Sequence, residues 1–256
     1  MMERIFLSDV HLYPEPEEHP GRKKFLDFLE HILENKDPGE LWILGDLFDF
    51  WFEFSSAIPS GYGQCLFALQ RLTRAGWKIS LLRGNHDFWA GRQLEDMTGL
   101  EVHESNTAEI EAGGRKVLLA HGDGMGPGDL GYRILKPIIR SRAARFIYRM
   151  LQPDIGSFLA RSFSGTSRRI LRRDLDRIPN GLTQWVQARL EEGFDIVITG
   201  HTHLDKVLKS KKGIHVSLGD WLTRFTYCII DEEYEDPVLV THRPGSRGEI
   251  MNGRAL

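Results

Sequence analysis

Cysteine is scarce in this sequence, and no long hydrophobic run occurs in it. The 256 residues include only two cysteines, Cys65 and Cys228, which form no Cys-x-x-Cys pair. This argues against a disulfide framework and a thiolate zinc site, and predicts that both thiols are buried. The longest apolar stretch, 41–52, is interrupted by Asp46 and Asp49 and is far shorter than the ~20 residues of a membrane-spanning helix. The N-terminus shows no apolar leader, so we expect a cytoplasmic protein without a transmembrane helix.

Acidic residues are almost absent from one segment of the chain, residues 124–178. The formal net charge is −3, but this segment holds twelve Lys or Arg and four Asp, a local charge of +8 that leaves −11 elsewhere. Such a block is typical of a surface for an anionic partner, whether nucleic acid, lipid headgroups or a phosphorylated substrate. The alternative is a solvated helical face whose arginine stems cover apolar surface. Solvated faces usually mix both signs of charge, which favours the anionic partner.

Short β-branched or aromatic segments alternate with helical patterns through the first half of the chain, which predicts an α/β fold. Apolar residues at helical spacing in 25–33 and 66–72 predict two crossover helices between the first three strands. We expect strands at 4–8, 40–44, 78–82, 101–103, 107–110, 116–120, 195–199, 215–218, 225–231 and 238–241. The last dozen residues, with their glycines, predict a loose tail.

The character of the sequence changes after Gly124. Apolar residues at helical spacing alternate there with basic ones, namely Ile134, Leu135, Ile138, Ile139, Phe146, Ile147 and Met150 with Arg133, Lys136, Arg140, Arg142, Arg145 and Arg149. This amphipathic basic pattern is typical of a membrane-surface helix, unless its apolar side packs on the core. Nucleic acid is disfavoured because few aromatics interleave with the charges. We predict one α/β domain over 1–256 with a helical cap inserted at 124–179.

Five short polar motifs each follow a predicted strand. They are Asp9-Val10-His11, Gly45-Asp46-Leu47-Phe48-Asp49, Gly84-Asn85-His86-Asp87, His121-Gly122-Asp123 and Gly200-His201-Thr202-His203. In an open α/β sheet, residues beyond the carboxyl ends of the strands converge on one crevice, so all five motifs can meet. Each motif alone is more often a capping or hydrogen-bonding arrangement. Five in succession, most beside a glycine that permits a tight turn, favour one common site.

These motifs supply imidazoles, carboxylates and one carboxamide, without thiolates. Such nitrogen and oxygen donors suit divalent ions, with Mn²⁺ as the first expectation and Fe or Zn²⁺ as alternatives. Seven candidate ligands exceed the needs of one ion. They predict a two-metal centre that activates water for in-line attack on phosphorus, with Asp46 as the bridging carboxylate.

The ordered motifs resemble those of the calcineurin-like metallophosphoesterase superfamily over nearly the whole chain. The resemblance implies a four-layer α/β/β/α metallophosphoesterase sandwich and two ligand sets that share one carboxylate. The implied sets are Asp9, His11, Asp46 and His203 for the first ion and Asp46, Asn85, His121 and His201 for the second. It further implies that His86 and Asn85 assist at the phosphate and that Asp87 orients the His86 ring. Asp49 and Asp123 match positions that orient metal ligands.

A narrower resemblance is to the UDP-2,3-diacylglucosamine pyrophosphohydrolases of lipid A synthesis, the LpxH family and its LpxH-like relatives. It rests on Leu44-Gly45-Asp46-Leu47-Phe48-Asp49-Phe50-Trp51, Asp129-Leu130-Gly131-Tyr132, Leu218-Gly219-Asp220-Trp221 and the position of the basic insertion. The implied reaction is hydrolysis of the diphosphate of UDP-2,3-diacylglucosamine to UMP and 2,3-diacylglucosamine 1-phosphate. Two positions depart from the best-known members. His86 stands where they have arginine, and Leu204-Asp205 stands where they usually have Arg-Pro.

In that family the insertion is a cap that takes the acyl chains. The resemblance implies Tyr132, Ser167 and Arg168 as substrate contacts. It implies an acylated nucleotide sugar as substrate and a peripheral location on the cytoplasmic face of the inner membrane, without a nucleic-acid partner or an obligate protein partner. A phosphodiesterase or phosphatase for soluble nucleotide-type substrates would share the metal core but has no use for such a cap. A non-catalytic interaction module is the third possibility, although such modules lose ligands and none is missing here.

Overall fold

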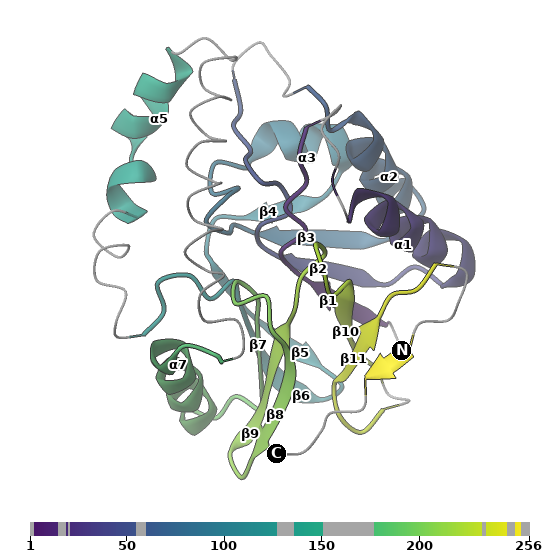
Figure 1. The fold of residues 1–256 in the computed structure, drawn as a ribbon, viewed down its shortest axis with the longest axis vertical. Helices are drawn as coiled ribbons and strands as arrows, with labels where there is room; N and C mark the ends of the chain where they lie inside the picture. Colours follow the sequence, from purple (N-terminus) through teal and green to yellow (C-terminus); the bar gives the residue numbers. More distant parts are fainter. Residues whose placement is uncertain are drawn as a thin grey trace.

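Two β-sheets lie face to face in the computed structural model of the chain, which describes residues 3–14, 19, 21–54, 60–126, 136–150, 177–231, 234–244 and 249–251 (Figure 1). The larger sheet contains, in order, β12 (Glu249–Met251), β11 (Val238–Thr241), β10 (Thr226–Ile230), β1 (Arg4–Leu7), β2 (Glu40–Leu44), β3 (Lys78–Leu82) and β4 (Glu101–His103). The smaller contains, in order, β5 (Thr107–Ala112), β6 (Arg115–Ala120), β7 (Ile196–Thr199), β9 (Gly213–Leu218) and β8 (Asp205–Ser210).

Parallel pairing brings the ends of the central strands together. In the larger sheet β1, β2, β3 and β4 are parallel neighbours, and in the smaller sheet β6, β7 and β9 are parallel neighbours. Parallel strands need crossover connections, which the helices between them supply. The segments that follow these strands therefore leave each sheet at a common edge.

Helices cover the outer face of each sheet. The larger sheet is covered by α1 (Arg22–Asn35), α2 (Gly63–Arg74) and α3 (Arg92–Thr98), and the smaller sheet by α7 (Asn180–Glu191) (Figure 1). Side chains of successive strand residues point to opposite faces. In β1, Ile5 and Leu7 belong to the core under the helices, whereas Phe6 belongs to the core between the sheets. The predicted four-layer α/β/β/α sandwich is confirmed.

The periodicity of α1 explains its place in the core. Phe25, Phe28, Leu29 and Ile32 are its buried residues, and their spacing of three and four puts them on one face of a helix. The expected crossover helices at 25–33 and 66–72 correspond to α1 and α2. Both predicted core thiols, Cys65 and Cys228, are free and buried.

The short helix α5 (Arg142–Arg149) lies away from both sheets (Figure 1). Its N-terminus is capped by Ser141, whose Oγ accepts a hydrogen bond from the Ala144 amide at 3.1 Å. This helix belongs to the predicted cap 124–179, most of which lies outside the described residues. Among the described residues, no helix combines the length and the apolar character that crossing a bilayer requires.

Four elements differ from the sequence prediction. The expected loose tail is wrong for 249–251, because these residues form β12 and pair with β11. The strand β8 and the helices α3 and α7 were not expected. β8 is an edge strand whose residues are all partly or fully exposed, so its sequence lacks the alternation that marks a half-buried strand.

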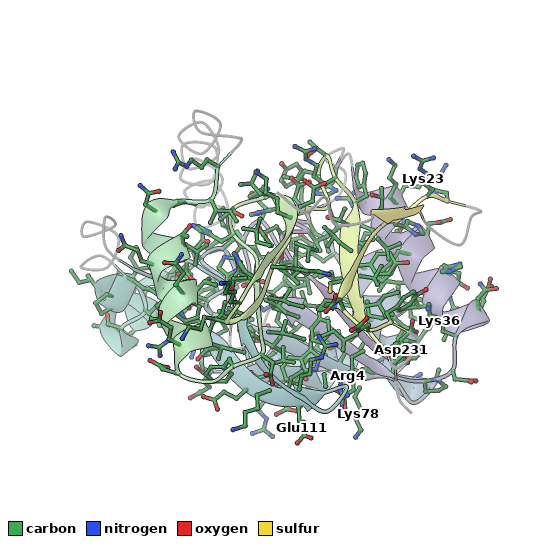
Figure 2. All side chains as sticks on the ribbon, turned by 90° about the horizontal axis from the view of Figure 1, so that it is seen from below. Arg4, Lys23, Lys36, Lys78, Glu111 and Asp231 are labelled. Atoms are coloured by element: carbon green, nitrogen blue, oxygen red, sulfur yellow. The ribbon has the colours of Figure 1, made fainter. Side chains whose placement is uncertain are left out.

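Charged residues begin strands of the larger sheet, at the ends opposite to those that carry the motifs. Arg4 and Lys78 begin β1 and β3, and both lie at one margin of the molecule in Figure 2. Glu40 begins β2, the strand between β1 and β3, and its Oε2 lies 2.8 Å from Arg4 Nε. Exposed pairs of this kind contribute only about 0–1 kcal/mol to stability. The apolar layers, not these pairs, hold the strands in place.

The packing of α1 predicts a large stability difference between two phenylalanines. The Phe28 ring is fully buried, with its centroid 4.9 Å from those of Trp221 and Tyr227. Phe28→Ala should lower the free energy of unfolding by about 3–5 kcal/mol because it leaves a cavity. Phe67 on α2 is 61% exposed, so the control Phe67→Ala should change it by less than about 0.5 kcal/mol. Denaturant titration measures both, and equal losses would contradict this description of the core.

Candidate metal centre

The predicted ligands gather where the central strands of both sheets end. Asp9 follows β1, Asp46 follows β2 and Asn85 follows β3 in the larger sheet. His121 follows β6 and His201 follows β7 in the smaller one. The crevice thus receives ligands from both sheets, which explains why five motifs spread over almost 200 residues can act together.

Two groups of donor atoms match the two ligand sets that the resemblance implies. Asp9, His11 and His203 form one group, and Asp46, His121 and His201 form another, each with its donor atoms within 4.8 Å of one another. Asn85 joins the second group, because its Oδ1 lies 2.9 Å from His121 Nε2.

Asp46 lies between the two groups. Its Oδ2 is 3.7 Å from His11 Nε2 in the first group and 3.4 Å from His121 Nε2 in the second. Two donor atoms that both lie ~2.1 Å from one cation are at most about 4.2 Å apart, so either distance allows a shared ion. Its Oδ1 accepts a hydrogen bond from the His86 amide at 2.9 Å, which fixes the carboxylate plane. This position suits the bridging role expected for Asp46.

Asp9 resembles Asp46 in that a backbone amide binds one carboxylate oxygen and the other oxygen faces histidines. Oδ2 accepts a hydrogen bond from the His201 amide at 2.8 Å, while Oδ1 lies 3.6 Å from the Nε2 atoms of both His11 and His203. Asp9 Oδ1 and His11 Nε2 are buried and have no hydrogen-bond partner in the described structure. Buried polar atoms are rarely left without a partner, and a cation between these two atoms would satisfy both. The donor set therefore fits divalent ions.

Most of the predicted ligands share an unusual backbone conformation. Among the described residues, six other than glycine have a positive φ, and five of these are predicted ligands: Asp9 (55°), His11 (49°), Asp46 (54°), His201 (66°) and His203 (57°). Such left-handed conformations cost of order 1–3 kcal/mol each and cluster at functional sites. Backbone hydrogen bonds hold them, including His11 N to Asp46 O at 2.9 Å and Trp221 N to Asp9 O at 3.0 Å.

The glycines of the motifs leave room for ligands from neighbouring strands. A Cβ atom at Gly84 would lie 2.1 Å from Asp46 Oδ1, and one at Gly45 would lie 2.5 Å from His121 Nδ1. Gly45 also has a φ of +85°, which glycine adopts without steric cost. These glycines are thus required by close approach as well as by the turns that the sequence predicted.

Acceptors behind the histidines select which ring nitrogen faces the crevice. His121 Nδ1 donates to the Leu44 carbonyl at 2.7 Å, which leaves Nε2 for the ligand group. His203 Nδ1 lies 3.2 Å from Asp220 Oδ2, which leaves its Nε2 facing Asp9. Such a carboxylate fixes the orientation of a ligating histidine and raises its basicity. Asp220 was not predicted to have a role. It nevertheless follows β9 in the same way as the other site residues follow their strands.

The role expected for Asp87 is wrong. Its carboxylate oxygens accept hydrogen bonds from the amides of Gly84 and Leu47, both at 2.8 Å, so it joins the loops after β2 and β3. The His86 ring is oriented instead by the Asp49 carbonyl, 2.8 Å from His86 Nδ1. That carbonyl can only accept, so Nδ1 carries the hydrogen and Nε2 is the free nitrogen.

The two residues expected to orient ligands lie beside the two groups. Asp49 Oδ1 is 3.8 Å from His11 Nδ1 of the first group. Asp123 is buried behind the second group and pairs with Lys136, whose Nζ is 2.7 Å from Asp123 Oδ2. The three expected substrate contacts, Tyr132, Ser167 and Arg168, lie outside the described residues and stay a prediction.

The charges of the centre favour a bound cation. Burial alone would raise the pKa of the Asp9 and Asp46 carboxyls, but the nearby histidines hold both pKa values well below their usual range. Burial opposes a charge on His121 as well, yet the carboxylates, Asp46 above all, raise its pKa to about 10. Burial and the neighbouring His121 lower the pKa of His201 to about 4. The carboxylates thus create a negative potential that stabilises positive charge between them.

The arrangement predicts how single variants change metal binding. The wild-type protein should bind two Mn²⁺ per chain, as measured by elemental analysis after gel filtration and by calorimetric titration. His203→Ala should weaken only one ion and His121→Ala only the other, whereas Asp46→Ala should weaken both because Asp46 contacts both groups. The losses should be at least about 10–100-fold, the usual effect even of groups that merely support a ligand. One ion per chain in the wild-type protein would contradict the two-group description.

Known proteins resemble this chain in sequence over most of its length. The calcineurin-like phosphoesterase family model matches residues 2–205. A UDP-2,3-diacylglucosamine hydrolase of Pseudomonas putida is 31% identical over 235 residues, 90% of this chain and 95% of that protein. One from Aeromonas salmonicida is 30% identical over 261 residues, 98% of this chain and 100% of that protein. Among solved structures, Vps29 of Entamoeba histolytica complexed with Zn²⁺ covers 98% of each chain at 15% identity, with a TM-score of 0.47. The family match and the identity to the curated relatives show that this chain belongs to the calcineurin-like phosphoesterase family and is a hydrolase.

Proposed function

We propose that this hydrolase cleaves the diphosphate of UDP-2,3-diacylglucosamine, giving UMP and 2,3-diacylglucosamine 1-phosphate, a step of lipid A synthesis. The observation that carries the proposal is the near full-length identity of about 30% to relatives named UDP-2,3-diacylglucosamine hydrolase. The complete set of predicted ligands in one crevice supports a catalytic role over a non-catalytic interaction module.

An aromatic wall beside the metal centre supports an acylated substrate. Phe50 and Phe52 lie one and three residues after Asp49, and their rings lie 5.6 Å and 4.4 Å from the ring of Tyr148 on α5. Trp89 completes the cluster, 5.0 Å from Tyr148 and 4.9 Å from Phe52. Phe50 and Tyr148 are its partly exposed members, and burial of acyl carbons against them would contribute ~0.8 kcal/mol per methylene.

The outward side of the cap supports a peripheral location on the cytoplasmic face of the inner membrane. Four apolar side chains of the segment 136–150 are mostly exposed, namely Ile138 (61%), Phe146 (65%), Ile147 (64%) and Met150 (75%). Clustered exposed apolar side chains mark interaction surfaces. A helix that presents such residues is suited to the headgroup region of a membrane, where the proposed substrate resides.

In this proposal the two groups each hold one divalent ion, with manganese as the metal expected from the donor types and iron or zinc as the alternatives. Asp9, His11 and His203 hold the first, Asn85, His121 and His201 hold the second, and Asp46 contacts both. Two bound cations would supply Lewis acidity and a water of lowered pKa. Hydrolysis forms a bond between the water oxygen and one phosphorus and breaks the bridging P–O bond, so one phosphate leaves with the acylated sugar.

His86 and Asn85 are proposed to stabilise the charge on the reacting phosphoryl group. A ring nitrogen of His86 lies within 4.8 Å of donor atoms on His11 and Asp46, so the ring borders the metal groups. Burial opposes protonation, but Asp46 and Asp49 outweigh it and raise the pKa of His86. With Nδ1 donating to the Asp49 carbonyl, Nε2 is the atom that can donate to a phosphoryl oxygen.

The role of His86 predicts a specific kinetic effect. His86→Ala should lower kcat by ~10²–10³, the usual effect of removing one donor to developing negative charge. Two Mn²⁺ per chain should still bind, because His86 is not among the proposed ligands. Steady-state kinetics with parallel metal analysis measures both quantities. Unchanged kinetics would refute the role, and a change confined to KM would indicate ordinary substrate binding instead.

Substrate comparison tests the proposed function itself. The value of kcat/KM should be much larger for UDP-2,3-diacylglucosamine than for its deacylated analogue, because each buried methylene contributes ~0.8 kcal/mol. Ile138→Ser should reduce turnover of the acylated substrate and leave that of a small chromogenic diester unchanged. Equal kcat/KM values for the acylated and deacylated substrates would overturn the proposal in favour of a phosphodiesterase or phosphatase for soluble nucleotides.

A further inference from the structure

Arg140 connects the cap segment to two of the loops that carry metal ligands. One guanidinium nitrogen, Nη2, donates to the Gly84 carbonyl at 2.8 Å and lies 3.6 Å from Asp123 Oδ2. The guanidinium carbon lies 5.5 Å from the centroid of the Phe88 ring. Gly84 begins the loop that contains Asn85 and His86, and Asp123 ends the motif that begins with His121.

The contacts of Arg140 differ from those of its basic neighbours. Lys136 contacts the His121 motif, through the Asp123 carboxylate at 2.7 Å and the Asp123 carbonyl at 3.3 Å. Arg145 donates to the Trp89 carbonyl at 3.0 Å, beyond the last predicted site residue of the β3 loop. Arg140 therefore joins the loop after β3 in one sheet to the loop after β6 in the other.

The two joined loops carry ligands of the same proposed ion. His121 Nε2 and Asn85 Oδ1 lie 2.9 Å apart, and they come from different sheets. Their separation depends on how the two sheet edges are held relative to each other at this point. Both contacts of Arg140 are made by Nη2, which donates a hydrogen bond to the Gly84 carbonyl and forms an ion pair with Asp123, and the planar guanidinium fixes the direction of this nitrogen.

We propose that Arg140 is a positioning residue of the second metal group, through which the cap sets the spacing between the Asn85 loop and the His121 loop. The assignment of the ions to these groups rests on the proposed function. Arg140 itself is not a ligand. Its positive charge is compensated by Asp123, which is buried and lies between Arg140 and the ligand group. The cap thus supports the geometry of the metal centre in addition to any contact it makes with substrate.

Calorimetric titration of the metal-free protein with Mn²⁺ tests the proposal without any turnover. Arg140→Ala should weaken one of the two ions by about 10–100-fold and leave the other within about twofold, the range typical for groups that support a metal ligand. The matched control is Arg145→Ala, which removes an arginine of the same cap segment whose hydrogen bond to the β3 loop is at Trp89, after the predicted site residues. It should bind both ions as the wild type does.

Kinetics with a small chromogenic phosphodiester adds a second measurement. Arg140→Ala should lower kcat by about 10-fold or more with KM within about twofold, because the loss acts on the centre and not on binding of the diester. Arg145→Ala should leave both values near those of the wild type. Arg140→Lys keeps the charge beside Asp123 but loses the planar guanidinium that directs Nη2 at the Gly84 carbonyl, and should recover only part of the lost affinity.

Three results would overturn the role of Arg140. They are equal metal affinities for Arg140→Ala and Arg145→Ala, a loss spread evenly over both ions, and full recovery by Arg140→Lys. Thermal unfolding of each variant identifies a folding defect, in which case the Arg140→Lys titration decides. If the wild-type protein hydrolyses neither the diester nor the nucleotide sugar, the proposed function fails, while the titration still tests Arg140.

Discussion

The organisation of this protein depends on two buried carboxylates, Asp9 and Asp46, that each keep one oxygen without a backbone partner. In each, a backbone amide from a different strand-end loop binds one oxygen, so the other is aimed at the imidazoles. Burying such charges is costly unless they are paired or bind a metal. The sandwich makes this possible, because the strand ends of both sheets converge and supply the amides, the histidines and the glycines that leave them space. The left-handed backbone of Asp9 and Asp46 is part of the cost that the apolar layers offset.

The sequence predicts the fold class, most strands and the residues that gather at the candidate site for a physical reason. Strand periodicity and the glycine that precedes Asp46, Asn85 and His201 are local properties, and parallel topology then brings the strand ends together. The contacts behind the ligands are not local. Asp220 supports His203 and Asp87 clamps the loops after β2 and β3, and neither partner can be read from spacing along the chain. β8 escaped prediction because this edge strand has little burial to impose a pattern.

The basic block of the cap shows the same limit. Its net charge predicts a surface for an anion, but Lys136, Arg140 and Arg145 direct their charges at Asp123 and at backbone carbonyls of the core. Apolar side chains such as Phe146 and Met150 face outward instead. The segment therefore has the reverse of the polarity expected for a helix on a water-exposed surface. Composition alone shows that the segment contains basic and apolar residues, but it does not show in which direction the side chains of each kind point.

Under the proposed function, this reversed polarity separates the two tasks that an amphiphilic substrate sets. The core presents rigid nitrogen and oxygen donors, whose geometry depends on hydrogen bonds between loops and tolerates little movement. An acyl chain needs apolar surface of adaptable shape, which a helix set apart from the sheets can offer through Tyr148 and its aromatic neighbours. Arg140, which precedes this helix, contacts Gly84 and Asp123, within the same loops that carry Asn85 and His121. The contacts that attach the cap segment therefore lie in the same loops as the proposed metal ligands. A change in the attachment of the cap should alter the geometry of the metal centre, and the reverse.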